Sequence, residues 1–173
     1  MKKARVLLWE DCNRNCEGCC NKSIDLKALP QVNMRDLKKY DTIILTGGEP
    51  MLYPERLLTI SNGLRKKFPD TKLVLYTAKV NDPLWRRIAI NFDGVTITLY
   101  DQQDIYLFEA YAMLNHYPRV IDKRLNVFSS VRLTQLQLEK FENNCWDIKT
   151  DIEWIKDCPL PDGEEFVRWT RKR

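Results

Sequence analysis

Short apolar runs alternate with longer amphipathic segments along most of the chain. Runs of about 4–8 apolar, β-branched or aromatic residues predict buried strands. Such runs are Val6–Trp9, Thr42–Thr46, Lys72–Thr77, Gly94–Tyr100 and Leu125–Val131. Apolar residues at helical spacing, with capping residues or prolines before them, predict the helices. These are Asp36–Tyr40, Pro54–Lys67, Pro83–Asn91, Gln102–Asn115 and Thr134–Asn143.

The alternation of strands and helices predicts βαβ units in a parallel sheet, with right-handed crossovers. A closed eight-stranded barrel needs at least about 200 residues, and this chain has 173. We therefore expect an α/β fold, a partial, open (β/α) barrel of about five to six parallel strands. The chain is predicted to form one domain, 1–173, with its core over about 4–131. The pattern leaves the structure of the extension 132–173 open.

The fourth predicted strand has one polar face. Thr96, Thr98 and Tyr100 share that face, because side chains alternate along a strand. A parallel sheet covered by helices on both faces is apolar on both. The polar row therefore favours a sheet with helices outside and a ligand cavity inside. The alternative is that threonine occurs here only for its β-propensity.

Composition narrows the function classes slightly. Hydrophobic residues make up 44% of the chain and charged residues 30%, as in ordinary globular domains. No apolar run approaches the roughly 20 residues of a membrane span. Val6–Trp9 is also too short for the apolar core of a signal peptide. We expect a cytoplasmic protein that keeps its N-terminus and does not enter a membrane.

The basic residues gather at the C-terminus. The formal net charge is +4, and much of the surplus lies in the last residues, at Arg168, Arg171, Lys172 and Arg173. A solvated tail is the plainer interpretation. Contact with an acidic partner surface is the alternative, and nucleic acid is the less favoured partner.

The cysteines are clustered. Four lie close together at Cys12, Cys16, Cys19 and Cys20, and His116 is the sole histidine of the sequence. A tight cysteine cluster in a cytosolic chain indicates metal binding rather than a disulfide framework. The remaining pair, Cys145 and Cys158, is interpreted as free thiols rather than as an auxiliary metal centre.

Three of the clustered thiols suit an iron–sulfur centre with one open position. Cys12, Cys16 and Cys19 lie within eight residues, and thiolates are preferred ligands of iron–sulfur clusters and zinc. A structural zinc site needs four ligands. We interpret Cys20 as a non-ligand because the side chains of adjacent residues diverge. A closed zinc site that includes Cys20 is the alternative.

A glycine-rich turn follows the second predicted strand, in the segment Leu45–Pro50, which reads LTGGEP. In parallel α/β sheets, ligands bind beyond the carboxyl ends of the strands. Paired glycines such as Gly47 and Gly48 allow a ligand to approach the backbone closely. The alternative is a plain connection between a strand and a helix.

Together the two motifs resemble the radical S-adenosylmethionine superfamily. The resemblance rests on Cys12-x3-Cys16-x2-Cys19 after the first strand and on Gly-Gly-Glu-Pro after the second, and it covers roughly 6–131. The flanking segments 16–23 and 45–54 are similar to the small activases of glycyl radical enzymes, above all the anaerobic ribonucleotide reductase activase.

The resemblance implies a chemistry. Cys12, Cys16 and Cys19 are expected to hold a [4Fe–4S] cluster whose open iron binds S-adenosylmethionine. Reductive cleavage of that cofactor gives a 5′-deoxyadenosyl radical, which takes a hydrogen atom from a peptide, nucleotide or small molecule. An electron donor such as a flavodoxin or ferredoxin, and anaerobic conditions, are implied. An open side of the barrel favours a protein or peptide as substrate.

The resemblance also implies cofactor-binding residues. Gly47, Gly48 and Glu49 are expected at the methionine end of the cofactor. Thr77 and Thr98 are candidates for its methionine or ribose, and Ser130 is a weaker candidate. Where the family often has an aromatic residue near adenine, before the third cysteine, this chain has Gly18. Adenine is therefore expected to bind elsewhere, near the backbone of Asn21.

Two further functions stay open from the sequence. The first is an activase that installs a glycyl radical on a partner enzyme. The second is a zinc or iron–sulfur binding module without enzymatic activity. The repeated βα units and the diglycine turn favour a radical enzyme over the binding module.

Overall fold

A computed structural model describes residues 1–113, 120–155 and 159–170 of the chain. Four groups of predictions therefore lie outside the described residues: the end of the helix predicted to reach Asn115, His116, Cys158, and the tail residues Arg171, Lys172 and Arg173. Among the described residues, no helix is long and apolar enough to cross a membrane.

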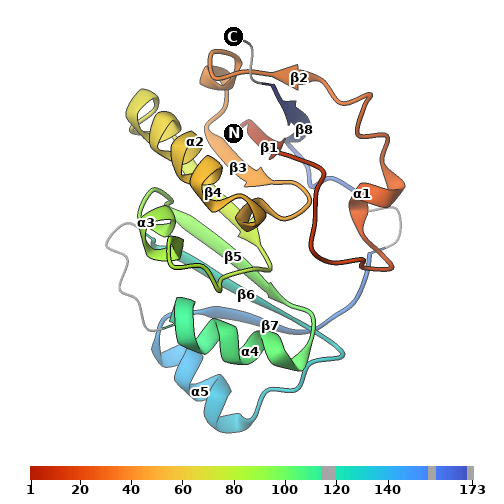
Figure 1. Ribbon diagram of the computed structural model, residues 1–173, viewed down its shortest axis with the longest axis vertical. Helices are drawn as coiled ribbons and strands as arrows, with labels where there is room; N and C mark the ends of the chain where they lie inside the picture. Colours follow the sequence, from red (N-terminus) through yellow and green to blue (C-terminus); the bar gives the residue numbers. More distant parts are fainter. Residues whose placement is uncertain (114–119, 156–158, 171–173) are drawn as a thin grey trace.

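One open sheet organises the described part of the chain (Figure 1). Its eight strands are all parallel and lie in the order β2-β8-β1-β3-β4-β5-β6-β7. The strands are β1 (Lys3–Leu7), β2 (Gln31–Val32), β3 (Thr42–Thr46), β4 (Lys72–Thr77), β5 (Gly94–Leu99), β6 (Asp122–Phe128), β7 (Asp147–Ile152) and β8 (Glu164–Trp169). The predicted α/β fold with a partial, open barrel is confirmed.

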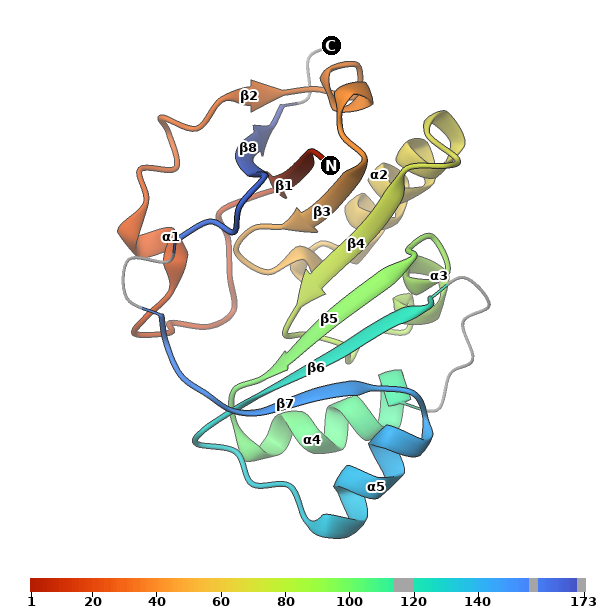
Figure 2. The ribbon, with the colours of Figure 1, turned by 180° about the vertical axis from the view of Figure 1, so that it is seen from behind.

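Helices α2, α3 and α4 cover one face of this sheet, as the front and back views show (Figures 1 and 2). The helical elements are α1 (Cys20–Ser23), η1 (Asp36–Lys39), η2 (Pro50–Leu52), α2 (Pro54–Lys67), α3 (Trp85–Ala89), α4 (Gln102–Phe108), the π-helical turn η3 (Glu109–Met113) and α5 (Gln135–Asn143). Helix α4 begins at a capping box made by Asp101 and Asp104. That cap satisfies backbone donors at the helix start.

The described strands outnumber the five to six that were predicted. The additional strands include β7 and β8, which come from the segment after residue 131. Strand β7 is an edge strand without buried residues, and β8 buries only Val167. Their hydrophobic pattern is weak for that reason. Strand β8 inserts beside β1, so the C-terminal segment joins the sheet next to the N-terminus.

The two faces of the sheet differ in polarity, as the pattern of the fourth predicted strand, now β5, indicated. Residues such as Val6, Leu45, Leu75 and Ile97 are fully buried in the core beneath the helices. On β5, Thr98 points the other way and lines a cavity. The predicted apolar outer face and inner cavity are confirmed for this strand.

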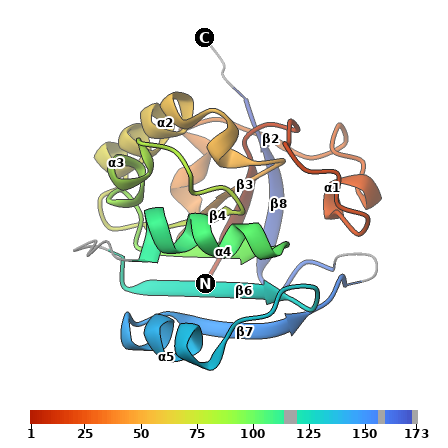
Figure 3. The same ribbon diagram turned by 60° about the horizontal axis from the view of Figure 1, so that its bottom comes forward.

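A cluster of three aromatic side chains packs helix α5 and the start of strand β7 against this core. Phe108 of α4 packs edge-on against Phe141 of α5, with ring centroids 5.0 Å apart. The ring of Trp146, which precedes β7, lies 4.8 Å from Phe108. All three side chains are buried. Phe141 and Trp146 therefore belong to the same hydrophobic core as Phe108, and Figure 3 shows α5 beside β7.

Phe141→Ala should lower the free energy of unfolding by about 3–5 kcal/mol, because it removes a large buried ring and leaves a cavity. Urea denaturation followed by circular dichroism measures the change. Leu136→Ala, on the same helix but with a side chain 75% exposed, should change stability by less than about 0.5 kcal/mol. Equal stability of both variants would show that α5 is not part of the cooperative core.

Candidate functional site

The cysteine loop begins where the backbone after β1 pairs with the turn after β3. Leu8 N donates to Thr46 O at 2.9 Å, Gly48 N to Trp9 O at 2.8 Å, and Glu49 N to Asp11 O at 2.9 Å. The indole Nε1 of Trp9 also donates to the Glu49 carbonyl, at 2.8 Å. These bonds extend the β1–β3 pairing to the residue before Cys12.

The close contact between these two backbone segments explains why residues 47 and 48 are both glycine. Gly47 has φ of 147°, and a Cβ there would lie 2.6 Å from Trp9 O. A Cβ on Gly48 would lie 2.0 Å from Asp11 O, far inside any tolerated contact between nonbonded atoms. The sequence suggested that the glycines admit a ligand. The structure shows that they admit the chain that leads to the cysteines.

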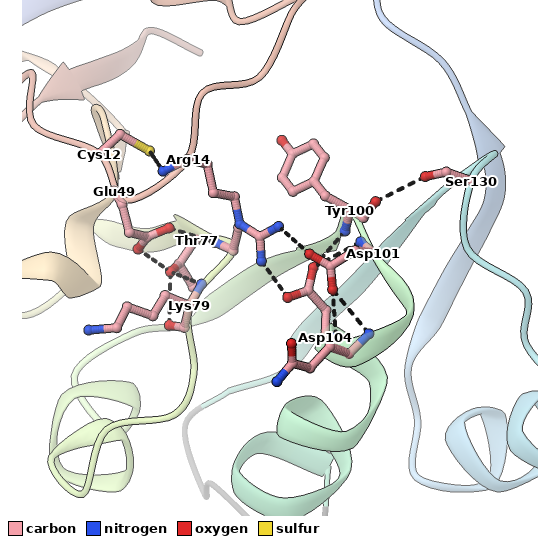
Figure 4. Close-up of polar contacts among 11 residues, drawn as sticks. Cys12, Arg14, Glu49, Thr77, Lys79, Tyr100, Asp101, Asp104 and Ser130 are labelled. Carbon is pink, nitrogen blue, oxygen red and sulfur yellow. Dashed lines mark hydrogen bonds and ion pairs between the residues drawn. The ribbon is translucent and has the colours of Figure 1, made fainter.

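A cavity of about 230 Å³ lies at the carboxyl ends of the central strands. Its lining includes eight of the predicted site residues: Cys12, Cys16, Cys19, Gly47, Gly48, Glu49, Thr77 and Thr98. Ser130 is not part of this lining. It is exposed, and its hydroxyl donates to the backbone carbonyl of Tyr100 at 2.9 Å (Figure 4).

The three predicted ligand thiols are free, and each is partly exposed to solvent or to the cavity. Burial raises the pKa of the Cys12 and Cys16 thiols, and the neighbouring Cys19 raises both further. The Arg14 guanidinium opposes this rise in the pKa of both thiols. Cys20 differs because it is disulfide-bonded. Cys145 is free and exposed, and it does not line the cavity.

Among the described residues, no three His, Cys, Asp or Glu side chains converge closely enough to hold a single metal ion. A cluster several ångströms across needs its thiolates to surround it from different sides. The three cysteines line one cavity, which is the arrangement that the structure shows for them.

Residues 3–107 match a family model described as a 4Fe-4S single cluster domain. The chain belongs to this family. No curated protein matches the chain. The matched residues include the three free cysteines and the diglycine turn. Thiolates hold iron–sulfur clusters, so the residues present fit the group, and Cys12, Cys16 and Cys19 would hold it at this cavity.

Glu49, which lines the cavity described above, is 2% exposed. Its carboxylate accepts hydrogen bonds from Met51 N at 2.7 Å, the Thr77 hydroxyl at 2.5 Å and Ala78 N at 2.9 Å (Figure 4). Burial raises the pKa of this carboxyl, and the bond from Thr77 opposes that rise. Glu49 and Thr77 thus bind each other and join the end of β3 to the end of β4.

Arg14 is a site residue that the sequence interpretation missed. Its backbone N–H donates to the Cys12 sulfur at 3.4 Å. Its guanidinium pairs with Asp101 at 3.0 Å and with the nearly buried Asp104, and it lies 5.3 Å from the Tyr100 ring centroid. The cysteine loop is therefore anchored to the start of α4. An arginine between two ligand cysteines was a visible signal, but its partners were not.

Gly48→Ala should displace the cysteine loop, because the added methyl meets backbone atoms that no rotamer change can move. We expect less than half of the wild-type iron per chain after anaerobic reconstitution. Gly63→Ala is the matched control. It lies within α2, where the nearest atom to a new Cβ is the flexible Met34 methyl at 3.3 Å. Wild-type iron content in Gly48→Ala would refute the steric argument.

Arg14→Ala should release the loop from α4 and leave the Asp104 carboxylate without its cation. We expect a loss of about 1–3 kcal/mol in unfolding free energy and faster loss of iron to a chelator. Arg14→Lys keeps the charge but not the forked geometry of the guanidinium. Its stability and its rate of iron loss should therefore lie between those of the wild type and Arg14→Ala. If Arg14→Ala matched the wild type in both measurements, the ion pair would have no anchoring role.

Proposed function

We propose that this protein is a radical S-adenosylmethionine enzyme. The observation that carries the proposal is the meeting of three free cysteines and a diglycine turn at one cavity, beyond the carboxyl ends of β3, β4 and β5. Three protein thiolates leave one iron of a [4Fe–4S] cluster to bind a ligand. Membership of the 4Fe-4S single cluster domain family supports the part of the proposal that concerns the iron–sulfur cluster.

When bound, the reduced cluster supplies one electron that splits S-adenosylmethionine into methionine and a 5′-deoxyadenosyl radical able to take hydrogen from a substrate. The protein's part is to bind, orient and exclude water. Gly47 and Gly48 present backbone atoms to the cavity, and the buried Glu49 places a carboxylate behind them. These groups suit the ammonium end of methionine.

Thr98 is the best remaining candidate for a polar contact with methionine or ribose. It lines the cavity from the inner face of β5. Thr77 also lines the cavity, but its hydroxyl already bonds Glu49, so we assign it a supporting role. The proposal requires a one-electron donor such as a flavodoxin or ferredoxin, and it includes a cytoplasmic, anaerobic setting.

Anaerobic reconstitution tests the proposal. The wild-type protein should become brown and, after reduction, convert S-adenosylmethionine to methionine and 5′-deoxyadenosine. Cys16→Ala should lose both the cluster and this activity, because it removes a ligand. Cys145→Ala, which removes an exposed thiol that does not line the cavity, should keep both. A colourless protein with bound zinc, or a brown protein that leaves the cofactor intact, would refute the proposal.

A further inference from the structure

A tryptophan from the C-terminal part of the chain reaches the cysteine loop. Trp154 follows β7, is 40% exposed and lines the cavity together with the three cysteines. It comes two residues after β7, the edge strand that β3, β4, β5 and β6 separate from β1. The chain after β7 therefore leaves the edge of the sheet and reaches the cavity at Trp154.

Trp154 occupies the space that a side chain at position 18 would need. A Cβ built on Gly18 would lie 2.4 Å from Trp154 Cγ and 2.5 Å from its Cβ. Gly18 stands between Cys16 and Cys19, so the tryptophan presses directly on the backbone that carries two of the three ligands. Only a residue without a side chain leaves room for this contact.

The indole ring is held in place by two further aromatic rings. It stacks on Tyr100 with centroids 5.4 Å apart and an interplanar angle of 13°. It also contacts Phe128 at the end of β6, at 4.5 Å. Tyr100 and Phe128 contact each other at 4.6 Å. Aromatic pairs of this kind each contribute beyond the area that they bury, so the position of Trp154 is well defined by its neighbours.

We propose that Trp154 is a positioning residue of the cluster site, which holds the segment Cys16–Cys19 in the conformation that binds the cluster and closes that side of the cavity. Tyr100 connects this contact to the other anchor of the loop, because the Arg14 guanidinium lies over the same ring. The loop is thus fixed between Cys12 and Cys16 by Arg14, and between Cys16 and Cys19 by Trp154.

The proposal rests on the cluster ligands and is independent of S-adenosylmethionine cleavage. A short loop without a hydrophobic core of its own gains order only from the elements that pack on it. Because the Trp154 side chain is partly exposed to solvent, removing it leaves no cavity in the core of the sheet. Loss of Trp154 should therefore affect the cluster far more than it affects global stability.

The experiment measures how fast iron leaves the reconstituted protein when a chelator is added without oxygen. Trp154→Ala should raise this rate about tenfold, the factor that corresponds to about 1.4 kcal/mol. Gly18→Ala should do the same from the other side of the contact, because its methyl displaces the indole. Trp154→Phe, which keeps an aromatic ring, should stay within about threefold of the wild type.

The double variant is the decisive comparison. Gly18→Ala combined with Trp154→Ala should be no worse than Trp154→Ala alone, because the methyl then enters vacated space and both changes break one contact. Hydrogen exchange of residues 16–20 in the iron-free protein should rise in both single variants. This readout needs neither the cluster nor the cofactor, so it stays valid if the enzyme does not cleave S-adenosylmethionine.

Leu136→Ala and Gly63→Ala serve as matched controls, for an exposed apolar side chain and for an added methyl away from the cavity. Both should match the wild type in iron loss and exchange. Wild-type rates in Trp154→Ala would overturn the proposal, and so would effects of Gly18→Ala and Trp154→Ala that multiply in the double variant. If Trp154→Ala failed to fold, Gly18→Ala and Trp154→Phe would carry the same test.

Discussion

The cluster site depends on backbone hydrogen bonds between residues 8–11 and 46–49. These bonds extend the pairing of β1 with β3 beyond the strands themselves. Because the two backbones approach without any space for a Cβ, Gly47 and Gly48 are required on one side. The result is that Cys12 starts its loop beside the end of β3. The position of the other two cysteines follows from this starting point and from the packing on their loop.

The buried carboxylate of Glu49 connects the turn after β3 to the next strand in the sheet, β4. It follows the glycines and receives hydrogen bonds from the end of β4, through Thr77 and Ala78. Carboxyl ends of parallel strands lie at one edge of a sheet, so aligned ends make a common wall. The polar inner face of β5 completes that wall with Thr98. The same geometry brings Glu49, Thr98 and the three cysteines to one shared cavity.

The loop between the cysteines has anchors on both flanks, and they meet at Tyr100. Arg14 connects the loop to the acidic start of α4, and Trp154 packs on it from the C-terminal segment. Burial and the neighbouring Cys16 and Cys19 raise the pKa of the Tyr100 phenol, so it remains a neutral ring between the two anchors. Most of this arrangement is fixed by side chains outside the cysteine motif itself.

The sequence alone determined the features that are encoded locally. Strands β3, β4 and β5 show as runs of apolar and β-branched residues because they are mostly buried. The cysteine spacing and the diglycine turn are properties of a few adjacent residues. Strands β7 and β8 bury too little to show a pattern. Tertiary structure alone decided that Arg14 pairs with Asp104, 90 residues away, and that Trp154 fills the space at Gly18. It also decided that the Thr77 and Ser130 hydroxyls bond protein groups, because only packing shows which neighbours lie within reach.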